Sequence, residues 1–180
     1  MLKPRRPISR RPMKKLPLLM LAGILALPAI GADEPAKTSP SADKVMSVTE
    51  AKLSGPFVLK DGAISQASTT DLSDGGRAVF TFQVAVAGDY LVHGIVNAPD
   101  ENSNSFFLNI DGDLQDQMIW DLEPTNGFEE RISNWRGNGD SESNGEFVPK
   151  VFKLSAGEHK LIIGGREPAS LKSISIRPAK

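Results

Sequence analysis

Residues Gly88–Gly112 read GDYLVHGIVNAPDENSNSFFLNIDG, and they contain two runs in which apolar residues recur at every second position. Successive side chains of a β-strand point to opposite faces, so each run predicts a strand with one buried face. The polar segment between the runs, APDENSNS, is rich in residues that favour turns. The stretch therefore predicts a β-hairpin that covers a hydrophobic core. The side chains predicted to face that core are Tyr90, Val92, Gly94, Val96, Phe106, Leu108 and Ile110.

The same pattern continues along the chain in short segments. The clearest alternation lies in Arg77–Val86, where the apolar positions include Phe80 and Phe82. No window has the period and length of an amphipathic helix, and Glu123–Pro149 is mostly loop in character. Many short strands separated by turn signals predict an all-β sandwich. Further strands are predicted at residues 45–52, 57–59, 63–67, 114–120, 151–154, 159–163 and 171–176.

Several of these segments carry a family resemblance. The runs GDYLV, NSFFLNIDG and LSAGEHKLII, followed by Gly165-Arg166-Glu167 and the closing strand Leu171–Ile176, resemble galactose-binding-domain-like jelly rolls. Within that superfamily the chain most resembles family-6 and family-35 carbohydrate-binding modules, over roughly residues 45 to 178. The resemblance implies a jelly-roll sandwich of two antiparallel sheets. It also implies a non-catalytic protein whose partner is a polysaccharide or oligosaccharide.

The first part of the chain has the pattern of an export signal. Seven of the 21 Lys and Arg residues and no acidic residue precede Asp33, and an apolar run spans Leu16–Ile30. This pattern predicts a signal peptide at 1–32 with cleavage after Ala32. The segment 33–44 is rich in Pro, Ser and Lys and is expected to be a flexible linker before a β-sandwich domain at 45–180. The sequence leaves open the true start, Met1 or Met13, and the general secretory or twin-arginine route.

Charge and cysteine content exclude several classes of function. Without residues 1–32 the chain keeps 14 basic and 22 acidic residues, a net charge of −8. This balance argues against a nucleic-acid partner and against adsorption to an anionic membrane. No cysteine is present, which excludes thiol catalysis, cysteine-ligated metals and a lipoprotein anchor. We expect an exported protein, periplasmic or extracellular, with no membrane partner in its mature form.

Two tryptophans are candidates for stacking on sugar rings. Trp135 lies in SNWRG, residues 133–137, a polar segment without strand alternation. The resemblance implies that a tryptophan in this interval belongs to a loop-edge sugar site, and the alternative is that Trp135 packs its own loop. Trp120 ends a predicted strand, so a core or rim position competes with a ligand contact there.

Three polar residues are candidates for bonds to sugar hydroxyls. Asn102 and Asn104 lie on the loop of the predicted hairpin, where amides can donate and accept hydrogen bonds. Asparagine also tolerates turn backbones, which is the alternative explanation for both. Arg166 precedes the last strand and can either bracket a ligand group together with Glu167 or pair with it as structure.

The resemblance also implies a structural calcium ion, but two positions depart from that pattern. Glu50 stands where the resembling modules place an acid at the start of the domain, whereas Lys172 occupies the position of the usual acid in the last strand. Calcium requires several oxygen ligands, and an ammonium group supplies none. We therefore expect no metal or cofactor, and we expect an ion pair between Glu50 and Lys172 to join the first and last strands instead.

Three function classes follow, and the first is favoured. It is a secreted, non-catalytic protein that binds glycan through loop-edge aromatic and polar residues. The second is an envelope structural or protein-interaction β-sandwich that binds no sugar. The third is a small glycan hydrolase, with Asp121 and Glu123 as its pair of carboxylates. The sequence does not specify the sugar, a loop-edge or sheet-face site, or the oligomeric state.

Overall fold

The computed structural model describes residues 44–137 and 147–180 of the chain. The predicted leader 1–32, its cleavage site after Ala32 and residues 33–43 of the predicted linker lie outside the described residues. The described residues form two β-sheets in which every paired strand is antiparallel. The predicted all-β sandwich is therefore confirmed. Among residues 44–137 and 147–180, no helix is long and apolar enough to cross a membrane.

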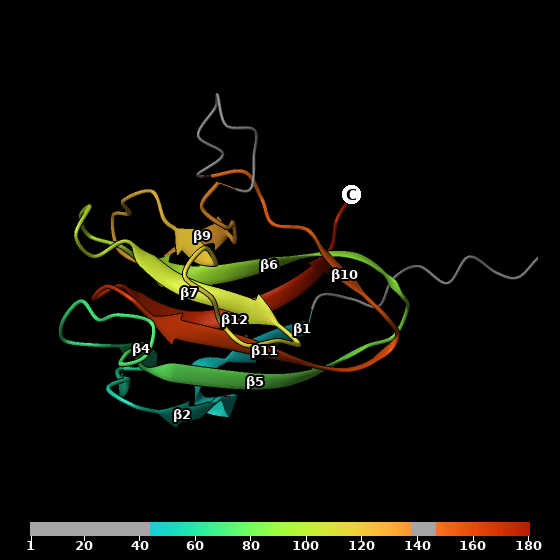
Figure 1. Cartoon of the computed structure of the whole chain (residues 1–180), viewed down its shortest axis with the longest axis horizontal. Coiled ribbons are helices and arrows are strands. Elements are labelled where there is room, and N and C mark those ends of the chain that lie inside the picture. Colours follow the sequence, from blue (N-terminus) through green and yellow to red (C-terminus); the bar gives the residue numbers. More distant parts are fainter. Residues whose placement is uncertain (1–43, 138–146) are drawn as a thin grey trace, which may run out of the picture. The chain divides into compact units, whose positions relative to one another are not determined.

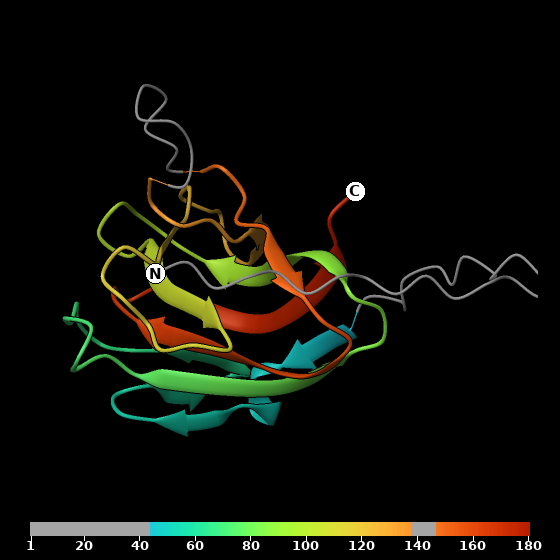
Figure 2. The same cartoon turned by 45° about the vertical axis from the view of Figure 1, so that its right-hand side comes forward.

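The two sheets contain seven and five strands (Figures 1 and 2). Sheet A consists of β1 (Lys44–Ser47), β3 (Val58–Lys60), β4 (Ala63–Ser65), β6 (Gly88–Asn97), β9 (Glu129–Ile132), β10 (Phe152–Leu154) and β12 (Ser170–Pro178). Sheet B consists of β2 (Lys52–Ser54), β5 (Arg77–Val84), β7 (Ser105–Ile110), β8 (Ile119–Asp121) and β11 (Gly157–Gly165). A short 3-10 helix, η1 (Val48–Glu50), follows β1. Strand β12 is central to sheet A because β1, β4 and β6 all pair with it.

The hydrophobic core lies between the two sheets and is built from the alternating residues of their strands. Every second residue of β5 from Ala78 to Val84 is buried, and so is every second residue of β6 from Tyr90 to Val96. The alternation predicted from sequence is thus confirmed for both strands. Complete burial of a Val, Leu, Ile, Phe or Met side chain contributes about 1.5–3 kcal/mol to the free energy of folding. The largest fully buried side chains are Trp120, Phe80, Phe82, Phe106, Met46, Ile64, Leu108, Leu122, Leu161, Ile163, Leu171 and Ile174.

The predicted hairpin at Gly88–Gly112 is wrong in one respect, because its two strands do not pair. Strand β6 belongs to sheet A, where it pairs with β9, β10 and β12, whereas β7 belongs to sheet B and pairs with β8 and β11. The connection at residues 98–104 crosses from one sheet to the other. Alternation identifies the buried face of a strand but carries no information about its neighbour, so both arrangements satisfy the same sequence pattern.

The predicted strand at residues 114–120 is also wrong over most of its length, since β8 contains only Ile119–Asp121. The preceding residues form the β7–β8 loop, which folds over the outer face of sheet B. Leu114 rests on Gly164 of β11, where a β-carbon would lie only 2.5 Å from the Leu114 side chain. Asp111, in a left-handed conformation with φ 57°, begins the loop and accepts a hydrogen bond from the Lys160 backbone N–H (2.8 Å).

The interval predicted as loop between Glu123 and Pro149 contains the strand β9, which pairs with β6. After β9, the side-chain amide of Asn134 bonds the backbone of Asp121 in β8. Asn134 accepts a hydrogen bond from the Asp121 N–H (2.9 Å) and donates one to the Asp121 carbonyl (2.7 Å), as a neighbouring backbone would. This asparagine, which is only 2% exposed, therefore fixes the segment that carries Trp135 and Arg136.

Candidate functional site

Three connections between the sheets meet at one end of the sandwich, which we call the loop end: residues 66–76, 98–104 and 166–169. Backbone hydrogen bonds join the first to the end of β11 and the third, from Thr70 to the Arg166 carbonyl (2.8 Å) and from Gly165 to the Gly76 carbonyl (2.8 Å), and the Asn104 N–H joins the second to the Glu167 carboxylate (3.1 Å). The close contact requires glycine at position 75, because a β-carbon there would lie 2.0 Å from the Gly165 oxygen. The buried side chain of Gln66 also stabilises this contact, because it donates to the Thr70 hydroxyl and accepts from the Gly76 N–H.

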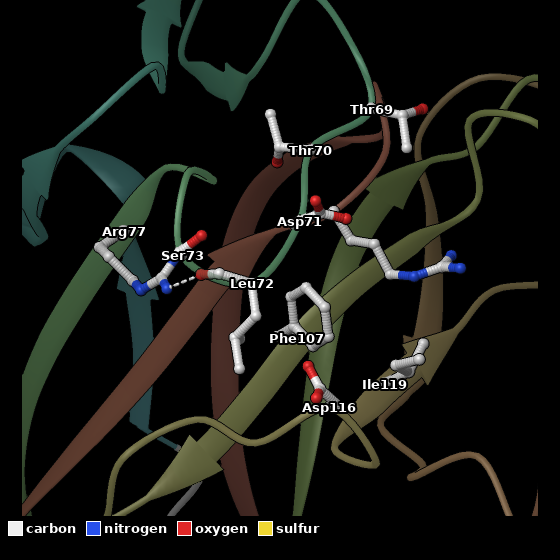
Figure 3. A pocket seen from close by; sticks show the side chains of 10 residues that line it. Thr69, Thr70, Asp71, Leu72, Ser73, Arg77, Phe107, Asp116 and Ile119 are labelled. Atoms are coloured by element: carbon white, nitrogen blue, oxygen red, sulfur yellow. Dashed lines mark hydrogen bonds between the residues drawn. The ribbon is translucent and has the colours of Figure 1, made fainter.

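A pocket of about 720 Å³ opens where the loop end meets the outer face of sheet B (Figure 3). We call it the loop-end pocket. Its walls come from five parts of the chain: the β4–β5 loop, the first residue of β5, strand β7, the β7–β8 loop with β8, and the β11–β12 turn. The lining residues are Thr69, Thr70, Asp71, Leu72, Ser73, Arg77, Phe107, Asp116, Ile119 and Arg166.

The floor of the loop-end pocket is apolar and its rim is polar. Phe107 is only 4% exposed, and in Figure 3 Asp71 lies above its ring and Asp116 below it. Both aspartates are exposed, and neither carboxylate bonds another side chain within the described part of the chain. The hydroxyls of Thr69 and Ser73 are on the same rim. The pocket thus presents acceptors and hydroxyls around an apolar surface.

Arg77 holds one wall of the pocket in place. One terminal nitrogen of its guanidinium donates to the carbonyls of Gly75 (2.9 Å) and Gly76 (3.0 Å), and the other donates to the Leu72 carbonyl. Burial lowers the pKa of Arg77 from its usual value. Because these bonds fix the backbone of residues 72–76, Arg77 acts as a structural residue at this site.

Arg166 is the sequence-predicted candidate that lines the pocket. Its Nη1 atom donates to the Ser105 hydroxyl (2.6 Å) and to the Glu167 carboxylate, while Glu167 also accepts from the Asn104 N–H (3.1 Å). Within the described residues no protein group accepts from Nε or Nη2 of Arg166. Arg166 therefore pairs with Glu167 and still has donors available to a ligand.

The two predicted asparagines lie nearby but differ in availability. The Asn104 amide donates to the Leu122 carbonyl (3.0 Å), so this side chain positions the loop after β8. Asn102 is exposed. Its backbone N–H donates to the Asp100 carboxylate (2.9 Å), which forms an Asx turn. Asn102, Asn104 and Arg166 all belong to the connections at the loop end, but of the three only Arg166 lines the pocket.

The prediction that Trp120 contacts a ligand is wrong. Its side chain is fully buried, its ring packs against Phe106 at 6.0 Å between centroids, and its N–H donates to the Ile132 carbonyl (3.2 Å). The adjacent glycine of β6, Gly94, leaves room for it, since a β-carbon there would lie 2.5 Å from the indole. Trp120 is therefore a core residue that fastens β9 to β8.

Trp135 is half-buried and lies away from the loop end, at the edge where β8, β9 and β10 close the sandwich. Its N–H donates to the Leu108 carbonyl in the middle of β7 (2.8 Å), and its ring meets Phe152 edge-on (5.8 Å). The Lys150 ammonium covers one ring face at 3.9 Å. A sugar could stack on that face only after Lys150 moves.

Arg136 and Asp121 form the most buried ion pair near this edge. The guanidinium donates two hydrogen bonds to the carboxylate (2.9 and 2.5 Å), and the Asp121 side chain is only 2% exposed. Asp121 is consequently engaged in structure, while Glu123 is exposed. In the hydrolase alternative Asp121 would act together with Glu123, but Arg136 already holds the Asp121 carboxylate.

The predicted ion pair between Glu50 and Lys172 is wrong as well, although β1 and β12 are neighbours as expected. Glu50 instead closes the capping box of η1 by accepting from the Ser47 N–H (2.8 Å). Lys172 lies at an irregularity of β12 and faces the Phe128 ring at 5.6 Å. In the described ranges, no group of three or more His, Asp or Glu side chains is placed to hold a metal ion.

Several pocket residues were not named as sugar-binding candidates from the sequence, among them Asp71, Phe107 and Asp116. The loop containing Asp71 has no feature that separates it from an ordinary polar turn. Phe107 did leave a signal, because Phe106 and Phe107 are adjacent and a strand buried on one face accounts for only one of them.

Comparisons with known proteins identify the fold. No family model and no curated protein sequence matches the chain. The family 35 carbohydrate-binding module of Paenibacillus barcinonensis has a TM-score of 0.54 and 10% identity, over 76% of this chain and 99% of that one. A family 6 module of Cellvibrio mixtus lichenase 5A, solved with cellotriose, has a TM-score of 0.50 and 14% identity, over 76% and 98%.

A larger enzyme shows the same fold in one of its parts. The isomalto-dextranase of Arthrobacter globiformis T6, complexed with panose, matches with a TM-score of 0.52 and 12% identity over 74% of this chain. The match spans only 23% of the length of that enzyme. The chain thus has the antiparallel β-sandwich fold of these family 35 and family 6 carbohydrate-binding modules.

Proposed function

We propose that this protein binds carbohydrate in the loop-end pocket and does not cleave it. The observation that carries the proposal is the pocket itself, which combines an apolar floor with side chains that still have bonding capacity. Sugars present C–H faces and hydroxyls, so they need both kinds of contact. The volume of about 720 Å³ lies within the range typical of small-molecule sites.

Each rim residue has a role in this proposal. Asp71 and Asp116 accept hydrogen bonds from sugar hydroxyls, and Arg166 donates through its remaining guanidinium nitrogens. Phe107 and Ile119 provide the apolar surface beneath the ring. Asn102, exposed on the 98–104 connection of the loop end, is proposed as a further contact for a longer ligand. Trp135 remains a candidate only for a separate contact at its own edge.

The proposal of a non-catalytic role is supported by the surroundings of the carboxylates. A glycosidase acid must stay protonated at neutral pH, which proteins achieve by burying it in an apolar environment. Asp71 and Asp116 are both exposed to water. The solved neighbours that match almost end to end are isolated binding modules, which fits the same role.

Export is part of the same proposal, because soluble glycan polymers are encountered outside the cytoplasmic membrane. The basic and apolar pattern of residues 1–32 supports a signal peptide, with the glycan-binding domain released at Asp33. The protein would then act in the periplasm or outside the cell.

The test is a glycan array followed by calorimetry on two variants and a matched control. We expect Asp71→Ala and Asp116→Asn each to weaken binding about ten-fold or more, because hydrogen bonds to a charged group contribute about 1.5–3 kcal/mol. Asp74→Ala removes a carboxylate from the same loop outside the pocket, so it should bind like the wild type. An empty array together with a co-purifying protein would favour the interaction-protein alternative.

A further inference from the structure

The outer face of sheet B carries a second groove, of about 640 Å³, beside the loop-end pocket. The strand register places Lys52 of β2, Val79 of β5 and Ile162 of β11 in one cross-strand row. Lys160 and Thr81 form the next row. We call this surface the sheet B groove. Because β2 and β11 both flank β5, and Lys160 lies two residues along β11 from Ile162, the backbones at Lys52 and Lys160 lie about 12 Å apart.

The far wall of the sheet B groove is the β7–β8 loop. Leu114 lies over Gly164 and faces Ile162, so an apolar strip of Val79, Ile162 and Leu114 runs along the groove. The loop backbone is fixed by the Asn109 amide, which donates to the Asp113 carbonyl (2.9 Å). The β7–β8 loop is therefore fixed by its contacts with the sheet beneath it.

The charge of the sheet B groove is opposite to that of the domain. Lys52 and Lys160 are exposed, and in the described ranges neither ammonium forms a hydrogen bond or an ion pair with another side chain. Arg77, whose two terminal nitrogens bond backbone carbonyls, adds a third positive charge, and Asp113 is the one carboxylate in the described lining. The carboxylate of Asp111 also interacts electrostatically with Lys160, but its main side-chain partner is His159. Residues 33–180 together carry a net charge of −8.

We propose that the sheet B groove is a second subsite that receives an anionic group, carboxylate or sulfate, of a polysaccharide chain. Lys52 and Lys160 face the anion, while Val79, Ile162 and Leu114 contact the sugar ring that carries it. Arg77 lines both the loop-end pocket and the sheet B groove, so one chain can run from the first into the second. This inference rests on the proposed function and narrows its ligand to acidic polysaccharides.

The experiment uses matched pairs of glycans and the full chain as it is produced. Uronic-acid polysaccharides are compared with their carboxyl-reduced forms, and sulfated polysaccharides with their desulfated forms, so that the two sources of negative charge are separated. Affinities are measured at low and at high salt. The protein variants are the double substitution K52Q/K160Q and, as a control, Lys60→Gln, which removes an exposed lysine from β3 in sheet A. Thermal midpoints check that each variant is folded.

We expect the wild type to bind one charged form about ten-fold or more tightly than its neutral partner at low salt, and we expect salt to reduce this preference. K52Q/K160Q should lose the preference and still bind the neutral form, whereas Lys60→Gln should keep it. Equal binding of charged and neutral forms would overturn the anionic subsite and leave the proposed function intact. A preference that survives in K52Q/K160Q would place the anion elsewhere. If no glycan of either kind binds, the proposed function itself fails.

Discussion

The ion pair of His159 and Asp111 makes the stability of this domain depend on pH in a direction that the structure specifies. His159 is only 6% exposed, and both of its ring nitrogens face acceptors: Nδ1 the Asp111 carboxylate (2.5 Å) and Nε2 the Ser155 carbonyl (2.9 Å). A neutral imidazole has one N–H and can satisfy only one of these acceptors, whereas the imidazolium satisfies both.

The signs of the two pKa shifts follow from these contacts. Burial alone would lower the pKa of His159, but the bonds to Asp111 and Ser155 outweigh it and raise the pKa above its usual 6.5. Its contribution to stability is complete below pH 6.5 and is lost as the pH rises through the raised pKa. Burial would raise the pKa of Asp111, but bonds from His159 and Lys160 outweigh it and lower the pKa. The contribution of Asp111 to stability is lost as the pH falls through its lowered pKa.

Asp111→Asn tests this account with little disturbance to the backbone. Asparagine tolerates the left-handed conformation at φ 57° and can still accept from the Lys160 N–H. Hydrogen bonds to charged groups contribute about 1.5–3 kcal/mol, and the 47% exposure of the Asp111 side chain reduces that value by solvent screening. We expect a loss of about 1–2 kcal/mol near pH 6, seen as a drop of about 3–6 °C in the thermal midpoint.

Urea unfolding between roughly pH 5 and pH 9 gives the assay. The wild type should lose stability above pH 6.5, while Asp111→Asn and His159→Gln should follow flatter curves. Asp113→Asn removes an exposed carboxylate from the same loop and leaves the pair of His159 and Asp111 in place, so it is the matched control and should keep the wild-type slope. The reasoning is refuted if Asp113→Asn removes the slope, or if Asp111→Asn leaves it unchanged.

Three further predictions concern the edge of the sandwich and the leader. Arg136→Met leaves the buried Asp121 carboxylate without its partner, but the Arg136 side chain is 45% exposed, so chemical denaturation should show a loss of about 1.5–3 kcal/mol; a loss below about 0.5 kcal/mol would contradict this. Trp135→Ala should lower the thermal midpoint by several degrees, because it removes packing against Phe152; an unchanged midpoint with lost glycan binding would restore its role in a sugar site. N-terminal sequencing of exported protein should begin at Asp33, and an intact Met1 or Met13 would contradict the predicted cleavage.

The sequence predicted local features of the fold better than it predicted neighbours. The phases of β5 and β6 were correct because alternation reports directly on which face of a strand is buried. The separation of β6 and β7 into different sheets could not be predicted from alternation. Alternation indicates which face of a strand is buried, but it does not indicate which strand pairs with it. The short β8 was overextended because Leu114 is apolar for a different reason: it packs on the outer face of sheet B over Gly164.

The candidate site was found only in part, for a similar reason. Arg166 was named because it stands beside the last strand in a motif, and the structure places it in the wall of the loop-end pocket. Asp71 and Asp116 come from loops far apart in sequence, so their proximity to Phe107 depends on the folded arrangement. The two tryptophans were named as candidates because aromatic rings stack on sugars. In the structure Trp120 is completely buried in the core, and Trp135 is partly buried and bonded to the Leu108 carbonyl.

The position of β12 determines when this domain can be assembled. Residues Ser170–Pro178 pair with β1, β4 and β6, so all of sheet A remains without its middle strand until this segment has been synthesised. A nascent chain that has reached only Ala169 can form local turns but cannot close its core, since Leu171, Ile174 and Ile176 are missing from it. Long-range strand pairing of this kind also slows folding. The core between the two sheets can therefore close only after β12 has been made, near the end of the described residues.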